Sequence, residues 1–103
     1  MKYLSYDIYL DIQKYKNNNR LAIAMHDVCT DALLTTLTVN LETDLVLKEN
    51  EAFVDVNNLP DIMKFIHTYK LGKPTNELEF SGFCAYPLVS FNLNEVKKYM
   101  KVK

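Results

Sequence analysis

Residues 52–72, AFVDVNNLPDIMKFIHTYKLG, contain the clearest secondary-structure pattern of the chain, a short strand followed by an amphipathic helix. Residues 53–56 are rich in β-forming side chains and predict the strand. Asn58 is a preferred N-cap residue, and Pro60 suits a first helical turn because its missing N–H costs no hydrogen bond there. Four apolar residues then follow at helical spacing: Ile62, Phe65, Ile66 and Tyr69. Gly72 predicts the end of this helix.

Alternating apolar and polar residues predict three strands before this unit. Residues 6–13 (YDIYLDIQ) and 21–25 (LAIAM) alternate with a period of two, and residues 16–19 (KNNN) between them favour a turn. These segments therefore predict a hairpin. Residues 36–41 (TLTVNL) predict the third strand because they are rich in β-formers.

The remaining β-rich segments predict two further strand pairs. Residues 45–47 (LVL) and 53–56 (FVDV) are close enough to pair as a second hairpin. The aromatic-rich segment 78–91 predicts a last strand pair. Within it, Gly82 indicates a bulge or a close approach of two backbones, and Pro87 indicates a sheet edge or a strand end.

Asn94 predicts the cap of a short final helix. Together these segments predict an α+β fold: a curved antiparallel sheet of five or six strands, one central amphipathic helix packed on it and a short C-terminal helix. The 103 residues are enough for one hydrophobic core, so we expect a single domain over residues 1–103.

The composition is that of a globular protein, with 49% hydrophobic and 24% charged residues. No apolar run approaches the roughly 18 residues that a membrane-spanning helix needs. The first residues lack the apolar core and small-residue cleavage site of a signal peptide, so we expect a cytoplasmic protein without a membrane partner. In that compartment the two isolated cysteines, Cys29 and Cys84, are expected to be thiols.

Charge is distributed unevenly between the two parts of the chain. Residues 1–61 contain ten acidic and five basic residues, whereas residues 62–103 contain three acidic and seven basic residues. This asymmetry indicates either a binding surface or two differently solvated faces. Arg20 is the only arginine beside eleven lysines, which argues against sequence-specific reading of DNA.

The residues that carry chemistry do not form a recognisable catalytic or metal-binding pattern. His26 and Cys29 make a His-x-x-Cys pair, but the other soft ligands, His67 and Cys84, are remote in sequence, so we expect no metal. A Cys–His nucleophilic pair is formally possible but lacks the glycines of an oxyanion hole. Two glycines are also too few for a phosphate-cradling loop. We therefore expect no cofactor and no enzymatic activity.

A binding role is the remaining expectation. Tyr9 falls on the polar face of the first strand between two aspartates, where an exposed tyrosine is a suitable anchor for a protein partner. The alternative is that Tyr9 packs against a neighbouring strand or loop. Five residues are the expected partner-binding site: Asp7, Tyr9, Asp11, Glu42 and Asp44.

The lysine-rich C-terminus offers a second kind of binding site. Four lysines, with Tyr99 among them, are the alternative nucleic-acid contacts: Lys97, Lys98, Lys101 and Lys103. A solvated tail is the other interpretation of this segment. An exposed sheet edge starting near Tyr6 would also allow a homodimer.

Several segments resemble a family of small bacterial proteins that contain a domain of unknown function and are carried largely on phages and conjugative elements. The likeness spans residues 33–92 and is carried by TLTVNL at 36–41, NEAFVDVNN at 50–58, SGF at 81–83 and YPL at 86–88. The family supplies no catalytic residues to carry over.

The resemblance implies a context rather than a reaction. Small proteins of mobile elements often bind host machinery, and anti-CRISPR proteins block a defence nuclease in this way. Our first hypothesis is therefore a non-enzymatic protein that inhibits a host defence complex, such as a CRISPR effector nuclease, with its acidic face against a basic nucleic-acid channel. The competing hypotheses are a nucleic-acid-binding accessory protein and an enzyme centred on Cys29 and His26.

Overall fold

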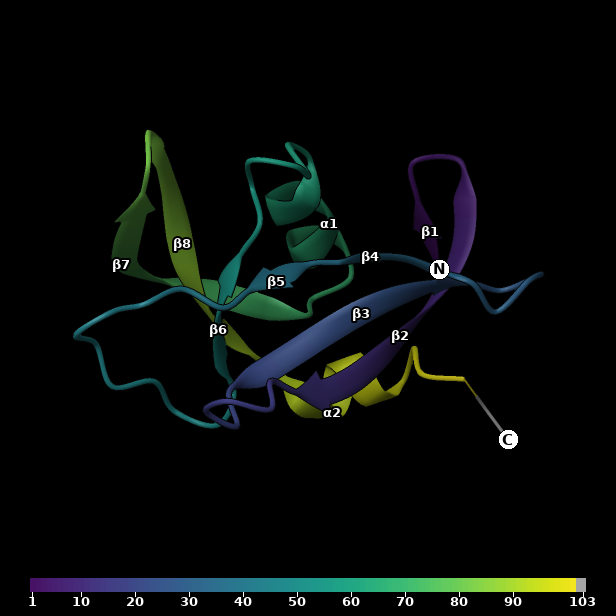
Figure 1. Ribbon diagram of the computed structural model, residues 1–103. Coiled ribbons are helices and arrows are strands. Elements are labelled where there is room, and N and C mark those ends of the chain that lie inside the picture. Colours follow the sequence, from purple (N-terminus) through teal and green to yellow (C-terminus); the bar gives the residue numbers. More distant parts are fainter. Residues whose placement is uncertain (102–103) are drawn as a thin grey trace.

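The computed structural model describes residues 1–101, whose strands divide between two antiparallel sheets of four strands each (Figure 1). The first sheet has the order β1 (Lys2–Tyr3), β2 (Tyr6–Lys14), β3 (Leu21–Asp27), β4 (Leu33–Thr36). The second has the order β5 (Thr38–Val39), β6 (Glu51–Val54), β8 (Cys84–Phe91), β7 (Gly72–Ser81). Two short helices complete the fold, α1 (Ile62–Thr68) and α2 (Leu93–Lys97). One sheet is curled into a half-barrel, and the predicted α+β class is confirmed.

The two sheets meet at Leu37, which explains why one predicted strand is two. Residues 36–41 were expected as a single strand, but β4 ends before Leu37 and β5 begins after it. The Leu37 N–H donates to the Ile23 carbonyl (2.9 Å) in β3, while the Leu37 carbonyl accepts from the Asp55 N–H (3.0 Å) just after β6. Because this buried residue bonds to both halves of the molecule, the chain passes here from one sheet to the other. The strands therefore form two sheets rather than the single sheet expected.

The predicted second hairpin is wrong. Residues 45–47 form no strand, and Val46 is 95% exposed. The reason is that both edges of β6 are occupied, one by β5 and the other by β8, so no edge is left for this segment to pair with. Residues 40–50 instead form a long loop, which Arg20 holds at its start through a hydrogen bond to the Leu41 carbonyl (2.5 Å).

The apolar stripe of the central helix is confirmed, because Ile62, Phe65 and Ile66 of α1 are buried. Its start differs from the prediction. The N-cap residue is Asp61, whose side chain makes no capping hydrogen bond, whereas Asn58 lies in a preceding turn and donates its N–H to the Asp55 carboxylate (3.2 Å). A turn capped by Asp55 therefore takes the place of the expected Asn58 cap.

The end of α1 also differs from the prediction. Lys70, with φ of 58°, takes the left-handed conformation that usually ends a helix at glycine, and Gly72 is already the first residue of β7. A side chain at position 72 would place its Cβ 2.7 Å from the Ser90 carbonyl oxygen. Gly72 is thus required by the close contact between β7 and β8 rather than by the helix end.

The last strand pair is confirmed as β7 and β8. Gly82 lies in the turn that joins them, with φ of 62°, rather than in a bulge. Pro87 lies within β8, opposite Leu78 and one residue beyond the part of β8 that pairs with β6. The cap of the final helix is Asn92, whose side chain accepts from the Glu95 N–H (3.3 Å), and not Asn94.

The N-terminal hairpin of β2 and β3 is confirmed, and the outer edge of β2 is paired within the chain from Tyr6 to Leu10. Tyr6 pairs with Tyr3 of β1, and the Leu10 N–H donates to the Tyr99 carbonyl (2.8 Å) near the C-terminus. Inward-facing residues of β2 and β3 pack with α1, β6 and β8 in one core. Neither helix among residues 1–101 is long and apolar enough to cross a membrane.

Candidate functional site

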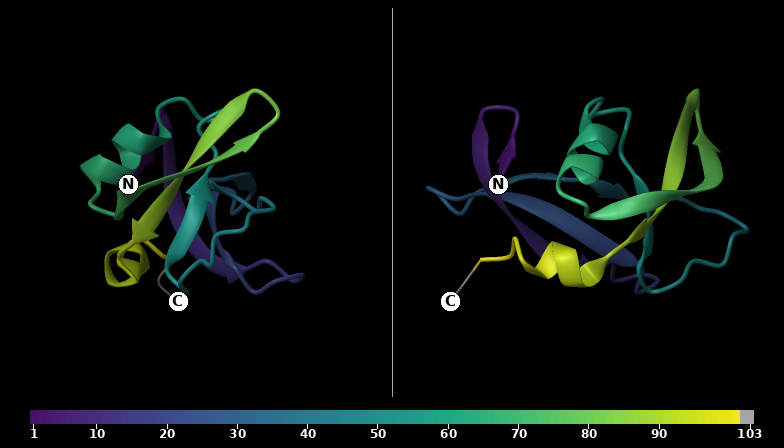
Figure 2. Two further views of the ribbon diagram at one scale, coloured as in Figure 1. Left: turned by 90° about the vertical axis from the view of Figure 1, so that its left-hand side faces the viewer. Right: turned by 180° about the vertical axis from the view of Figure 1, so that it is seen from behind.

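The outer part of the β7–β8 hairpin, residues 77–87, forms a two-stranded arm. Pairing of β8 with β6 reaches only Leu88, so beyond that point β7 and β8 pair with each other alone. The register of β7 is irregular between Pro74 and Leu78, where Asn76 has φ of 73°. Because such irregularities bend a strand, the arm leaves the sheet at an angle and stands at one end of the molecule (Figures 1 and 2).

One face of the arm is apolar. Leu78 lies opposite Pro87, and Phe80 lies opposite Ala85. Directly opposed residues of an antiparallel pair share a face, as do residues two apart along a strand, so these four side chains are on the same side. Leu78 is 51% exposed and Phe80 is 72% exposed. Phe83, in the turn at the tip, is fully exposed.

The opposite face of the arm is polar and acidic. Glu79 lies opposite Tyr86, and Ser81 lies opposite Cys84. Glu77 precedes them on the same face by its spacing from Glu79. Residues 77–87 contain no basic residue. The arm therefore combines an exposed apolar side with a negatively charged side.

The sequence patterns did not indicate the arm as a candidate binding surface. The predicted strand pair at 78–91 was assigned to the sheet, and its apolar residues were treated as parts of strands rather than as surface. A usable signal was present in Phe80-Ser81-Gly82-Phe83, where one large aromatic residue lies just before a tight turn and another lies within it. Alternation alone does not reveal whether a third strand covers the apolar side of such a hairpin.

The five predicted partner-binding residues fall into two groups. Glu42 and Asp44 are exposed in the loop 40–50, which lies at the same end of the molecule as the arm (Figures 1 and 2). The others, Asp7, Tyr9 and Asp11, lie along β2 in the other sheet. The structure therefore does not bring all five together.

Tyr9 packs against the neighbouring strand, which is the second of the two expectations for it. Its ring stacks on the His26 ring with centroids 5.1 Å apart and planes at 9°. Its hydroxyl donates to the Asp31 carboxylate (3.0 Å). Reduced hydration and the neighbouring Asp31 carboxylate raise the pKa of Tyr9. Tyr9 is thus half-buried in a polar cluster rather than free on the surface.

The two aspartates beside Tyr9 also have partners within the chain. Asp11 accepts a hydrogen bond from Gln13 Nε2 (2.6 Å), and its other neighbour is His26 Nε2 at 3.8 Å. Asp7 is exposed and lies 3.6 Å from Lys2 Nζ. The acidic strand face predicted from the sequence is therefore partly neutralised by local contacts.

Two of the predicted nucleic-acid lysines are paired with carboxylates of the chain. Lys101 Nζ donates to both carboxylate oxygens of Asp31 (2.8 and 2.9 Å) and lies 5.8 Å from the Tyr9 ring centroid. Lys98 donates to Glu95 (2.7 Å), and Lys97 is exposed. These contacts raise the pKa of Lys98 and of Lys101. Lys103 lies outside the described residues.

His26 makes its polar contacts with two aspartates. His26 Nδ1 lies 3.2 Å from the Asp31 carbonyl oxygen, and Nε2 faces Asp11. Within the described part of the chain, no three His, Cys, Asp or Glu side chains are grouped to hold a metal ion. Cys29 and Cys84 are not joined in a disulfide, and Cys29 is exposed.

Comparison with known proteins defines the family of the chain. The family model for "Domain of unknown function (DUF4313)" matches residues 9–103, a longer stretch than the likeness noted in the sequence. No curated protein and no solved structure matches. The expected membership in a family of unknown function is confirmed in that general form. The chain belongs to the family described as Domain of unknown function (DUF4313).

Proposed function

We propose that this chain is a non-enzymatic binding protein that uses the apolar face of the arm to engage a second protein. The observation that carries the proposal is the exposure of Leu78, Phe80 and Phe83 on one protruding hairpin. Large apolar side chains gathered on a surface mark interaction sites in soluble proteins, because exposing them to water has a free-energy cost that a partner removes. A projecting hairpin also fits a concave site more readily than a flat sheet does.

Charge at this end of the molecule indicates the character of the partner. Glu42 and Asp44 lie in the loop beside the arm, and Glu77 and Glu79 lie on the arm itself. Such a surface is complementary to an apolar groove with a basic border, which is the character of a protein channel that holds nucleic acid. By binding in such a channel, the chain would block the access of nucleic acid to it.

The partner we propose is a host defence complex, with a CRISPR effector nuclease as the specific case. Support for this step comes from the resemblance to proteins of phages and conjugative elements and from the acidic, apolar character of the arm end. In this proposal the chain inhibits the nuclease by excluding its nucleic acid, as an anti-CRISPR protein does. No catalytic step by the chain is involved.

The alternative, a nucleic-acid-binding accessory protein, is less well supported. Two of its lysines, Lys98 and Lys101, bind carboxylates of Glu95 and Asp31. Both contacts would have to break, or the carboxylates would repel the phosphates of a bound nucleic acid. We therefore retain the protein partner as the proposal.

The test begins with an affinity pulldown of the tagged protein from host lysate, followed by reconstitution of binding with the purified partner. The arm variant is Leu78→Ser with Phe80→Ser. Its matched control is Val28→Ser with Leu33→Ser, which removes two apolar side chains of similar exposure, 51% and 60%, outside the arm. We expect the arm variant to lose at least about tenfold in affinity, while the control keeps it.

A third variant separates the arm from the strand face predicted in the sequence. Reversing Asp7 and Asp11 to lysine should leave binding through the arm largely unchanged. Loss of binding in this variant together with full binding by the arm variant would overturn the arm as the contact surface. The inhibitor proposal is tested on the captured partner. If the partner is a nuclease that binds the chain stoichiometrically but still cleaves nucleic acid at its full rate, the proposal is contradicted.

A further inference from the structure

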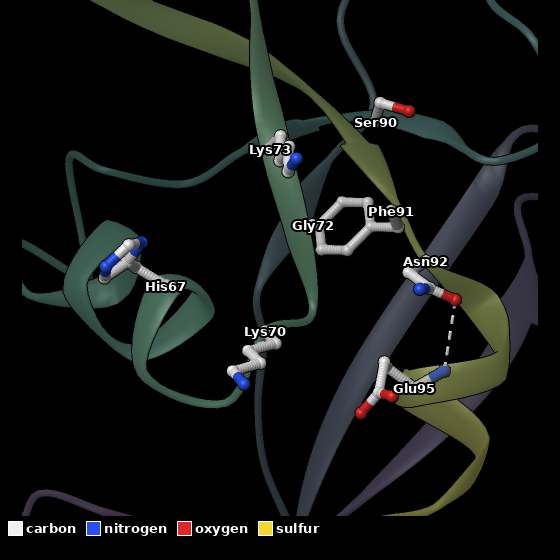
Figure 3. A pocket seen from close by; sticks show the side chains of 8 residues that line it. All are labelled: His67, Lys70, Gly72, Lys73, Ser90, Phe91, Asn92 and Glu95. Atoms are coloured by element: carbon white, nitrogen blue, oxygen red, sulfur yellow. Dashed lines mark hydrogen bonds between the residues drawn. The ribbon is translucent and has the colours of Figure 1, made fainter.

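A pocket of about 540 Å³ opens between the end of α1, the start of β7 and the start of α2, away from the arm. Eight residues line it: His67, Lys70, Gly72, Lys73, Ser90, Phe91, Asn92 and Glu95. Figure 3 shows His67 and Lys70 on the α1 side, Asn92 and Glu95 on the α2 side, and Phe91 between them. Its volume is within the usual range of small-molecule sites, about 300–1,000 Å³.

Basic side chains dominate the charge of this pocket. Lys70 and Lys73 are both exposed at its rim, and neither forms an ion pair with any residue of the described chain. His67 lies in the last turn of α1, three residues before Lys70. The two lysines are three residues apart, Lys70 just after α1 and Lys73 in β7, so the short connection between these elements keeps them close.

One uncharged side chain, that of Asn92, is arranged as a hydrogen-bond donor beside the lysines. Asn92 Oδ1 accepts from the Glu95 N–H (3.3 Å), which leaves its amide NH₂ available to a ligand. The Ser90 hydroxyl points away from the pocket (Figure 3) and accepts from Asn50 Nδ2 (3.2 Å), so it does not serve a ligand there.

The single carboxylate of the pocket is already compensated. Glu95 accepts a charge-assisted hydrogen bond from Lys98 Nζ (2.7 Å), one turn further along α2. Its negative charge therefore does not cancel those of Lys70 and Lys73. The pocket therefore offers more hydrogen-bond donors than acceptors and a net positive charge. Both properties favour the binding of an anion.

The floor of the pocket is fixed before any ligand binds. Phe91 is only 2% exposed and belongs to the core, and the Asn92 N–H donates to the Leu71 carbonyl (2.8 Å). Gly72 lets β7 approach β8 so closely that a Cβ there would lie 2.7 Å from the Ser90 carbonyl oxygen. A rigid floor with movable lysines at the rim suits a ligand whose charge lies at one end.

We infer that this pocket binds the phosphate group of a small phosphomonoester. Phosphate supplies a dianion and several acceptor oxygens for Lys70, Lys73 and Asn92. The pocket is much larger than a bare phosphate ion, so the group is carried on an organic molecule that fills the remaining space. This site is independent of the arm and of the partner proposed above.

The test is a titration of ¹⁵N-labelled protein followed by NMR. The probes are inorganic phosphate, adenosine monophosphate, adenosine, and a short oligothymidylate without terminal phosphates. We expect the monophosphate to produce saturable shifts at Gly72, Lys73 and Asn92 below about 1 mM, and adenosine to produce none. Inorganic phosphate should shift the same residues more weakly, because it lacks the organic part.

The pocket variant is Lys70→Asn with Lys73→Gln. Asparagine tolerates the left-handed backbone that Lys70 adopts, so the fold should be retained. A control of equal net charge, Lys16→Gln with Lys48→Gln, removes two exposed lysines elsewhere. We expect the pocket variant to weaken monophosphate binding at least tenfold and the control to leave it within twofold.

Three results would overturn the inference. The first is the absence of saturable shifts with the monophosphate. The second is equal binding by wild type and pocket variant, which would indicate that the monophosphate associates with surface lysines in general and not with this pocket. The third is a stronger response to the oligothymidylate than to the monophosphate, which would assign the pocket to the phosphodiester backbone of a nucleic acid.

Discussion

Lys101 donates to both carboxylate oxygens of Asp31, at 2.8 and 2.9 Å, although the two residues are 70 positions apart in the sequence. This bidentate contact attaches the C-terminal segment to the turn between β3 and β4. Asp31 also accepts from the Tyr9 hydroxyl, so one carboxylate joins three separate segments. Hydrogen bonds from Lys101 and then from Tyr9 lower the pKa of Asp31.

The first prediction concerns this contact and its pH dependence. Because its pKa is lowered in the folded chain, Asp31 stabilises the contact above the ordinary carboxyl pKa of 3.8, and the effect is lost as the pH falls through the lowered value. We expect Asp31→Asn to increase fast motion of residues 99–101 at neutral pH, measured by heteronuclear NOE. Wild type should approach the variant only in acid. Asp44→Asn is the control, and equal NOE values in wild type and Asp31→Asn at neutral pH would contradict the prediction.

The second prediction concerns Thr38, the one buried polar side chain in the described core. Its Oγ1 lies 3.0 Å from the Tyr15 hydroxyl and accepts from the buried Ile23 N–H (3.2 Å). Thr38→Val keeps the shape but leaves both groups without this partner, so we expect a loss of about 1–3 kcal/mol in the free energy of unfolding. Thr38→Ser retains the hydroxyl and should lose less. Urea unfolding of both variants makes the comparison, and equal losses would show that the hydroxyl is unimportant.

The third prediction separates the two glycines. At Gly72 a Cβ would lie 2.7 Å from the Ser90 carbonyl oxygen, whereas at Gly82 no atom lies within 4 Å. We expect Gly72→Ala to lower the free energy of unfolding by about 1–3 kcal/mol through overpacking. Gly82→Asn should stay within about 0.5 kcal/mol, because space is open and asparagine tolerates the positive φ. Thermal unfolding measures both, and a Gly72→Ala protein as stable as wild type would contradict the close contact.

The fourth prediction concerns the stability of the arm variants. Phe80 and Phe83 are exposed and contribute little to the core. Phe80→Ser with Phe83→Ser should therefore change the free energy of unfolding by less than about 1 kcal/mol, the sum of two ordinary surface effects. It should also reduce binding of a hydrophobic dye to the native protein. Ile66→Ala is the contrast, since loss of a buried side chain in α1 is expected to cost about 2–5 kcal/mol. A large loss of stability in the variant with Phe80→Ser and Phe83→Ser would mean that the arm packs on the rest of the protein.

Sequence patterns predicted the individual helices and strands better than they predicted which strands pair with each other. The hairpin at 6–25 and the apolar face of α1 are confirmed because period-two and helical patterns record which side chains are buried. The pairing of 45–47 with β6 was wrong, since β5 and β8 occupy both edges of that strand. Whether an edge is occupied depends on segments distant in the sequence, which no local pattern contains.

The candidate sites, like the strand pairings, depended largely on contacts between segments distant in the sequence. Lys98 and Lys101 looked like free charges in the sequence, but each has a carboxylate partner. The arm and the basic pocket were not predicted. Exposure of Phe80 depends on how β7 leaves the sheet, and the pocket forms because the start of α2 comes to lie near the end of α1.

Local sequence was sufficient for the α+β class and for the residues that α1 buries. These properties follow from side-chain hydrophobicity and backbone preference over a few residues. The division into two sheets required Leu37 to bond to β3 on one side and to Asp55 on the other. Contacts of this kind depend on loop closure and on the whole core packing at once, so the joint between the sheets, the exposed arm and the Lys101–Asp31 contact are properties of the folded chain alone.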